Sequence, residues 1–370
     1  MLLFTPGPTP TPEVIRAAMS VPTIHHRTPE FEEIFKTVRE KLIKIMNMPE
    51  VLMLASSGTG AMEAAVTNLC KSRALSINAG KFGERFGKIC KAFDIACTEL
   101  KYSWDTPASI EDILREIDKN PEIDVLCIQI CESAGGLRHD VEGIAKAVKS
   151  INKDIMVIAD GITAVGVEKI DTAHIDVLIT GSQKAFMLPP GLAMIGLSGA
   201  AVKKIESAPR GFYFNLASEL KSQRKNTTAY TAATTLIIGL RAMLELIEKE
   251  GFEKFYEDTK TRALSAKAAL EAIGLKIYPK SPALAMNTVY HERAKEIRAV
   301  AKKRYGVNIA GGQDELKDKL FRINNMGLIA PYEIAWALNA VELALDELGE
   351  RAYDGAANRV FVSKFFKGVK

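Results

Sequence analysis

The stretch "DVLCIQICE", residues 124–132, decides the fold class because six of its nine residues are apolar and they do not alternate with polar ones. A strand with one exposed face alternates apolar and polar residues, whereas a strand buried on both faces does not. The segments on either side, "SIEDILREID" (109–118) and "EGIAKAVKSI" (142–151), have the spacing of amphipathic helices, and Ser109 is expected to cap the first of them. A buried strand between two such helices is typical of a parallel sheet that helices cover on both faces.

The same alternation continues through the middle of the chain. A helix is expected at 60–71, and further strands are expected at 51–57, 75–78, 155–160, 175–181 and 192–198. The sequence therefore predicts an α/β fold with a large domain built on a parallel sheet.

The C-terminal part has a different pattern. A long helix from about residue 232 is followed by a charged amphipathic segment, by the short strands "LKIYP" and "NTVYH", and by further helices. The last helix is expected to begin at Pro331 and to end before Gly349, since proline favours a helix start and glycine a helix end. This pattern predicts a smaller α+β domain.

A chain of 370 residues is long enough for two domains. We place the large domain at 15–255 and the small domain at 256–370, with residues 1–14 packing near the active site.

Composition excludes several classes of protein. The net charge is only +4 and no dense Lys/Arg block occurs, so a nucleic-acid partner is not indicated. None of the five cysteines forms a CxxC and none lies beyond Cys131, so we expect neither a disulfide framework nor a metal centre, and a cytoplasmic location. The N-terminus "MLLFTPGPTPTPE" does not resemble a signal peptide. The uncharged run 185–202 is interrupted by Pro189 and Pro190, which indicates a buried turn and strand rather than a membrane span.

Ligands of a parallel sheet bind beyond the carboxyl ends of its strands, so the residues just after each strand are the candidate site. The first such segment is "SSGTGAMEAA", residues 56–65. A strand, a glycine-rich turn and a helix start direct backbone N–H groups and the positive end of a helix dipole at one point, and Ser57 and Thr59 add hydroxyl donors. This geometry suits a phosphate, although an ordinary tight turn would have the same letters.

Four other residues have both an ordinary and a chemical interpretation. Asp160 ends a strand, where a carboxylate can cap a turn or pair with a cationic ring nitrogen. Lys184 lies among small and apolar neighbours; most lysines at strand ends are simply solvated, but a dry setting lowers the pKa and makes the amine nucleophilic. Phe82, between glycines, is a core aromatic or a stacking surface. Arg322, in "LFRINNMG", is a structural ion-pair partner or a bidentate clamp for a carboxylate.

Each signal is weak alone, but together they are the parts that pyridoxal phosphate chemistry requires. A phosphate turn anchors that cofactor, a lysine holds it as a Schiff base, an acid keeps its ring nitrogen protonated, and an arginine orients an amino acid.

The segments "SSGTGAMEAA", "ADGITAVG", "GSQKAFMLPPGLAMI" and "FRINNMG" resemble class V aminotransferases, in particular the alanine–glyoxylate/serine–pyruvate aminotransferase branch. The similarity runs from "FTPGPTP" to the last predicted helix. It implies fold type I, with a mainly parallel seven-stranded sheet sandwiched by helices and a smaller α+β C-terminal domain. It also implies pyridoxal 5'-phosphate and a homodimer with active sites at the subunit interface.

The resemblance implies a role for each motif residue. Lys184 would carry the cofactor and move the substrate proton, and Asp160 would pair with the ring nitrogen. Arg322, with the backbone around Gly7, would bind the substrate carboxylate. The other residues implied to hold the cofactor are Ser57, Gly58, Thr59, Phe82, Ser133, Ile162, Gln183 and, from the partner subunit's side of the interface, Thr231, with Thr228 nearby.

The implied reaction is a ping-pong transamination from serine or alanine to glyoxylate or pyruvate. Aspartate is an alternative donor, for which Arg27 or Arg138 could supply a side-chain cation. "ESAGG", and Asn324 where the family usually has glycine, depart from the family pattern near the substrate. His25 and His26 lack an evident third metal ligand and are expected to have a structural or substrate-rim role.

Three other functions fit this sequence less well, two of them because no cysteine lies beyond Cys131 and none forms a cluster. A cysteine desulfurase would need a catalytic cysteine in the C-terminal half, and a hydrogenase-type electron-transfer subunit would need clustered cysteine ligands. A non-catalytic phosphate-binding module would have no use for Lys184, Asp160 and Arg322 together.

Overall fold

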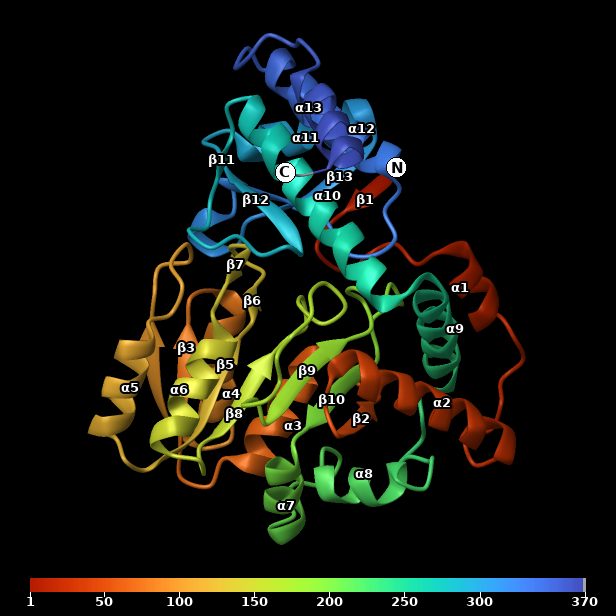
Figure 1. The fold of residues 1–370 in the computed structure, drawn as a ribbon, viewed down its shortest axis with the longest axis vertical. Coiled ribbons are helices and arrows are strands. Elements are labelled where there is room, and N and C mark those ends of the chain that lie inside the picture. The colour runs from red at the N-terminus through yellow and green to blue at the C-terminus, as the bar shows by residue number, and fades with distance from the viewer. Residues whose placement is uncertain (369–370) are drawn as a thin grey trace.

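The computed structural model describes residues 1–368, and its larger sheet has seven strands in the order β2-β10-β9-β8-β5-β3-β4 (Figure 1). Their bounds are β2 Glu50–Leu54, β3 Arg73–Asn78, β4 Ala96–Lys101, β5 Ile123–Gln129, β8 Met156–Asp160, β9 Val177–Gly181 and β10 Ala193–Leu197. Neighbouring strands are parallel except that β10 runs antiparallel to β2 and β9. The predicted α/β class and mainly parallel sheet are confirmed.

The expected strand 124–132 is shorter than predicted. It ends at Gln129, and the chain turns into a short hairpin of β6 (Cys131–Glu132) and β7 (Leu137–Arg138). The apolar letters continue past the strand because the hairpin is itself buried.

Helices cover both faces of this sheet. One apolar cluster contains Val51 and Met53 of β2, and a second cluster on the opposite face contains Leu52 and Leu54. The helices of the large domain are α2 Pro29–Met46, α3 Gly58–Leu69, α4 Lys81–Ala92, α5 Ile110–Lys119, α6 Val141–Ile151, α7 Gly199–Ser207, α8 Leu216–Gln223 and α9 Thr234–Glu250. Ser109 caps α5 as predicted, by accepting the Asp112 N–H at 3.3 Å.

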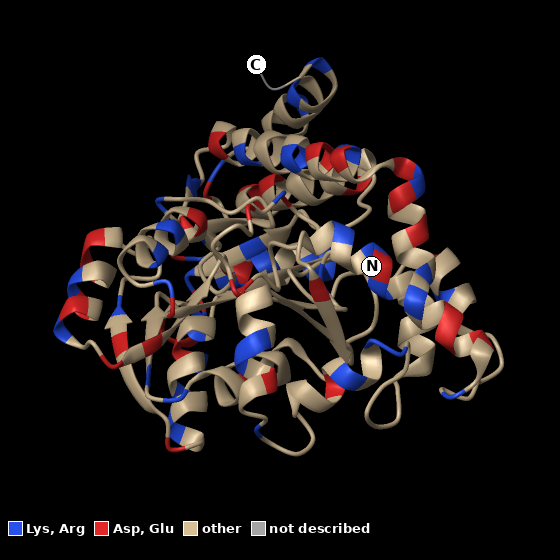
Figure 2. Ribbon diagram, turned by 60° about the horizontal axis from the view of Figure 1, so that its bottom comes forward, with Lys and Arg blue, Asp and Glu red and all other residues tan. Residues whose placement is uncertain are grey.

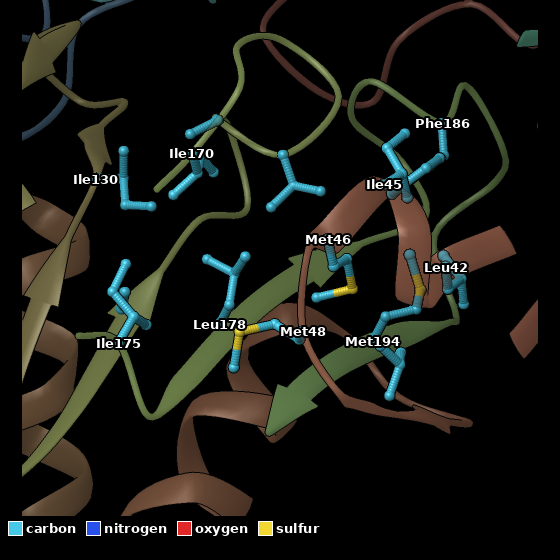
Figure 3. Close-up of a cluster of buried hydrophobic side chains, with 14 of the residues drawn as sticks. Leu42, Ile45, Met46, Met48, Ile130, Ile170, Ile175, Leu178, Phe186 and Met194 are labelled. Carbon is cyan, nitrogen blue, oxygen red and sulfur yellow. The ribbon is translucent and has the colours of Figure 1, made fainter. Parts of the chain in front are cut away.

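The first cluster joins α2 to the middle of the sheet. Figure 3 shows Leu42, Ile45 and Met46 of α2 beside Phe186 and Met194. Since Phe186 lies just past β9, the loop that follows this strand is anchored in the core.

The smaller sheet has the order β1-β13-β14-β12-β11 and joins the two ends of the chain (Figure 1). Its strands are β1 Leu2–Phe4, β11 Lys276–Ile277, β12 Met286–Tyr290, β13 Val307–Gly311 and β14 Leu320–Asn324. The helices on it are α10 Phe252–Ala272, α11 Ala294–Tyr305, α12 Pro331–Glu347 and α13 Ala356–Lys367, while α1 (Glu13–Met19) follows the N-terminal segment and packs against α9. The chain passes between the two sheets at the α9–α10 junction, and we propose the domain boundary there.

The helix that begins at Pro331 was expected to be the last one, and this expectation is wrong. The helix that begins at Pro331 ends at Glu347 as expected, but α13 follows it. Glu342, fully buried in α12, accepts the N–H groups of Ala356 and Ala357 at 3.1 and 2.9 Å and pairs with Arg351 at 2.7 Å. The start of α13 is therefore held by a side chain of another helix, a contact that sequence periodicity does not reveal.

Charged residues are interspersed along the outer helices in the view of Figure 2. No helix within residues 1–368 combines the length and apolar character needed to cross a bilayer. The uncharged run 185–202 forms a turn, the buried strand β10 and the start of α7. The expected buried strand is confirmed, and 185–188 are buried as expected, but Pro189 and Pro190 at the tip of the turn are exposed.

We predict that Glu342→Ala lowers the free energy of unfolding by about 1–3 kcal/mol, because the buried Ala357 N–H loses its side-chain acceptor while Ala356 and Arg351 keep only Asp354 as theirs. Urea denaturation followed by far-UV circular dichroism measures the change. Glu350→Ala, which removes an exposed ion pair with Arg293, is the matched control and should cost at most about 1 kcal/mol. Equal effects of the two substitutions would contradict the assigned anchor.

Candidate active site

The predicted site residues come together because their strands are parallel. β2, β3, β5, β8 and β9 all point their carboxyl ends to one edge of the large sheet. Ser57, Phe82, Ser133, Asp160 and Lys184 each follow or end one of these strands.

Lys184 lies three residues past β9 and is partly buried. Its Nζ donates to the Pro6 carbonyl at 2.5 Å, and a Cβ on Gly7 would come within 2.4 Å of the same nitrogen. Thr9 donates its hydroxyl to the Lys184 carbonyl at 2.7 Å. The structure therefore places the N-terminal segment directly over the lysine, and Gly7 is needed there because any side chain would displace the amine.

The loop that carries Lys184 is fixed by contacts with the hydrophobic core. Phe186 and Leu188 are fully buried, and the Leu188 N–H donates to the Ser182 carbonyl at 3.0 Å. The Ser182 hydroxyl donates to the Pro189 carbonyl at 2.8 Å and accepts the Leu192 N–H at 3.2 Å. These contacts close the Pro-Pro-Gly turn and fix the backbone that carries Lys184.

Burial brings the pKa values of Asp160 and Lys184 closer together. Desolvation, with a smaller contribution from the positive charge of Arg322, lowers the pKa of Lys184 from its ordinary 10.5 to about 8. Desolvation raises the pKa of Asp160 to about 6, although its carboxylate accepts the Ile162 N–H at 2.9 Å and is close enough to Lys184 to be stabilised by that charge. Two neighbouring groups whose pKa values are both strongly shifted are typical of a catalytic site.

The glycine-rich turn forms an anion cradle next to these groups. Gly58 opens α3, and its N-cap Ser57 does not use its side chain to cap the helix, so the first N–H groups of α3 remain available. A Cβ on Gly58 would lie 2.1 Å from the side chain of Ile162, so only glycine allows this approach. The buried Oε1 of Gln183, close to the same turn, has no partner among the described residues.

Glu132 is a site residue that sequence reasoning did not single out. It follows β5, is fully buried, and accepts the N–H groups of Phe82 and Gly83 at 2.9 Å each and that of Ala134 at 3.0 Å. Desolvation raises the pKa of Glu132 to about 7. Glu132 thus holds the Phe82 loop in place, and its position after the most apolar strand was the available signal.

Arg322 connects the small domain to the site. It lies on β14 and is 8% exposed. Its guanidinium donates to the Gly311 carbonyl at 2.9 and 2.6 Å and to the Ser133 carbonyl of the large domain at 2.5 Å. Desolvation lowers the pKa of Arg322 to about 10, and the negative charge of Glu132 partly offsets this effect.

Four other expected residues form no hydrogen bond with this cluster within the described residues of the single chain: Thr228, Thr231, His25 and His26. Thr231 is exposed, between α8 and α9, and lines a small cavity with Ala55 and Tyr230. Thr228 donates to the Tyr230 carbonyl at 2.5 Å. His25 and His26 stack with ring centroids 4.7 Å apart, and no group of three or more potential metal ligands occurs within residues 1–368.

The side chains present fit pyridoxal phosphate. The unpartnered Gln183 oxygen and the free helix N-terminus offer polar groups suited to a phosphate, and a side chain on Gly58 would displace the neighbouring Ile162. The buried Asp160 can face a cationic ring nitrogen, and the Lys184 amine is within Coulombic reach of that carboxylate.

Comparisons with known proteins agree with this geometry. Residues 2–314 match the family model "Aminotransferase class-V". A Helicobacter pylori protein named "Uncharacterized aminotransferase" is 54% identical, over 99% of this chain and 100% of that one. The serine–glyoxylate aminotransferase of Hyphomicrobium methylovorum is 31% identical, over 99% of this chain and 95% of that one. The crystal structure of a subgroup IV aspartate aminotransferase from Thermus thermophilus superposes with a TM-score of 0.87 and 31% identity, over 94% and 99% of the two chains. The chain therefore belongs to the class-V aminotransferases, a family that uses pyridoxal 5'-phosphate.

Proposed function

We propose that this transaminase moves the amino group of a small L-amino acid, serine or alanine, to glyoxylate or pyruvate in a ping-pong reaction. The observation that carries this proposal is the partly buried Lys184 amine, which lies within Coulombic reach of both the Asp160 carboxylate and the Arg322 guanidinium. The serine–glyoxylate relative supports this choice of substrates.

Each residue has a distinct task in the proposal. When bound, pyridoxal phosphate supplies an electron-withdrawing ring that acidifies the substrate α-carbon. Lys184 would hold the cofactor covalently until the substrate amine displaces it. The freed Lys184 amine would then take the proton from the substrate α-carbon and deliver it to the cofactor carbon that had carried the aldehyde. Asp160 holds the proton on the cofactor ring nitrogen. Arg322, helped by the backbone at Gly7, orients the substrate α-carboxylate.

Ser57, Gly58, Thr59 and Gln183 are proposed to bind the cofactor phosphate. Phe82 and Ile162 are proposed to enclose its ring from two sides, and Ser133 to lie at the ring oxygen. A non-catalytic phosphate-binding module would not explain why Lys184 is partly buried, with its pKa lowered to about 8, beside an acid.

Aspartate is the second candidate donor, favoured by the likeness to the Thermus enzyme. A side-chain carboxylate needs its own cation. Arg138 is already committed, since it pairs with Glu142 at 2.8 Å and with Glu168 at 3.0 Å. Arg27, exposed ahead of α2, remains for this role.

We also propose a homodimer in the cytoplasm. Thr231 is exposed in the single chain although its proposed partner is a phosphate, and exposed aromatic residues lie nearby. Phe212 is 80% exposed, and Tyr213 stacks on Tyr230 with centroids 5.3 Å apart. An aromatic surface of this kind is typical of a protein interface.

The function is tested by the visible absorption spectrum of the purified protein before and after L-serine, L-alanine or L-aspartate is added singly. We expect a yellow protein whose band bleaches with the true donor. Lys184→Ala should lose the covalent band and at least about 1,000-fold of the transamination rate, because it removes both the attachment point and the base. A wild-type protein that stays colourless with added cofactor would sink the proposal in favour of a phosphate-binding module.

The rate at which cofactor-free protein captures pyridoxal phosphate covalently should depend on the Lys184 pKa. Only the unprotonated amine reacts, so the rate should rise with pH and level off above about 8 rather than above 10.5. Arg322→Gln removes a positive charge that lowers this pKa, so its profile should shift to higher pH. Stopped-flow absorbance between pH 6.5 and 10 measures both profiles, and coincident profiles would show that Arg322 does not act on the amine.

Light scattering after size exclusion tests the dimer. We expect wild-type protein at about twice the chain mass of 40.5 kDa. Phe212→Asp should shift it toward the monomer, because a charge at the centre of an apolar interface is left desolvated. Phe93→Asp, at a 47% exposed aromatic that directly follows α4, is the control and should remain dimeric. A monomeric wild-type protein would refute the proposed assembly.

A further inference from the structure

Arg85 connects two parts of the site that the chain supplies separately. It lies in the first turns of α4, one turn after Phe82. Its Nη1 donates to the Thr59 hydroxyl at 2.7 Å, and its guanidinium carbon lies 4.6 Å from the centre of the Phe82 ring. One side chain therefore touches both a proposed phosphate ligand and the proposed stacking surface.

The charge of Arg85 is not neutralised by a carboxylate. Within residues 1–368 it forms no ion pair, whereas its helix neighbours Lys81, Glu84 and Lys88 all do. The hydroxyl of Thr59 accepts one of its hydrogen bonds but cannot balance a positive charge. The positive charge of Arg85 also acts on the candidate site. It makes a minor contribution to the lowered pKa of Lys184, and it slightly opposes the rise in the pKa of Asp160 that burial causes.

The proposed phosphate ligands lack exactly such a charge. Ser57, Gly58, Thr59, Gln183 and Thr231 are all neutral. A phosphate monoester carries about −1.5 to −2 charges at pH 7, and a helix N-terminus offers the equivalent of only about half a positive charge. The planar guanidinium of arginine matches phosphate oxygens in geometry and remains charged at any physiological pH.

We propose that Arg85 is the cationic ligand of the cofactor phosphate, which it binds through N–H groups that Thr59 does not occupy. The same guanidinium lies against Phe82 and so couples phosphate binding to the placement of the stacking ring. The inference rests on the proposed assignment of Thr59 and Phe82 to the cofactor site.

The test compares pyridoxal 5'-phosphate with pyridoxal, which has the same ring and aldehyde but no phosphate. Cofactor-free protein is titrated with each compound, and protein fluorescence and absorbance give the two dissociation constants. We expect Arg85→Gln to weaken binding of pyridoxal phosphate by about 10- to 100-fold, the range for a hydrogen bond between charged groups. Binding of pyridoxal should change less than about twofold.

Two further variants separate charge from structure. Arg85→Lys keeps the charge but loses the planar fork, so its loss for pyridoxal phosphate should be smaller than that of Arg85→Gln. Lys88→Gln, one turn further along α4 and exposed, is the matched control and should bind both compounds as wild type does. Inorganic phosphate should compete with pyridoxal phosphate in wild-type protein more strongly than in Arg85→Lys, a comparison that does not depend on the folding of Arg85→Gln.

Three results would overturn the inference. If Arg85→Gln weakens both compounds equally, Arg85 acts only on Phe82 and the ring. If it weakens neither, or if Lys88→Gln has the same effect, the residue is not a phosphate ligand. If wild-type protein binds neither compound, the proposed cofactor site fails together with the inference, and this outcome is distinct from a wild type that binds both.

Discussion

The site depends on one constraint: parallel strands of a single sheet end at the same edge. β8 ends at Asp160, β9 leads to Lys184, and β2 leads to the glycine-rich turn, so all three lie at one edge of the sheet. The glycine-rich turn is far from Asp160 and Lys184 in the sequence. Two apolar clusters, one on each face, hold the sheet in this arrangement. The packing of Phe186 against α2 extends this rigidity past the end of β9 to the lysine loop (Figure 3).

Desolvation gives the site its reactivity. Burial disfavours charge on Lys184, Asp160 and Glu132 alike, so it lowers the pKa of the amine and raises the pKa values of the two acids. The amine becomes available near neutral pH while the acids stay partly protonated. Glu132 is tolerated in the interior because three backbone N–H groups donate to it.

The N-terminal segment and the smaller sheet add residues to the candidate site at the edge of the large sheet. β1 pairs with β13 of the smaller sheet, and the segment after β1 covers Lys184 through Pro6, Gly7 and Thr9. β14 carries Arg322 to the Ser133 carbonyl of the large domain. In the proposed function, a substrate carboxylate bound at Arg322 would be placed by contacts that join both parts of the molecule.

The sequence by itself determined the class of sheet and several site residues. Continuous apolar strands are a local property, and Lys184, Asp160 and the phosphate turn could be found because each lies immediately after such a strand. The tertiary structure alone decided which distant groups meet them. Arg85 reaching Thr59, Glu132 holding the Phe82 loop, Pro6 covering Lys184 and Glu342 anchoring α13 are contacts between separate elements. No periodicity or spacing records them, because they depend on how helices and loops pack rather than on the residues that form each one.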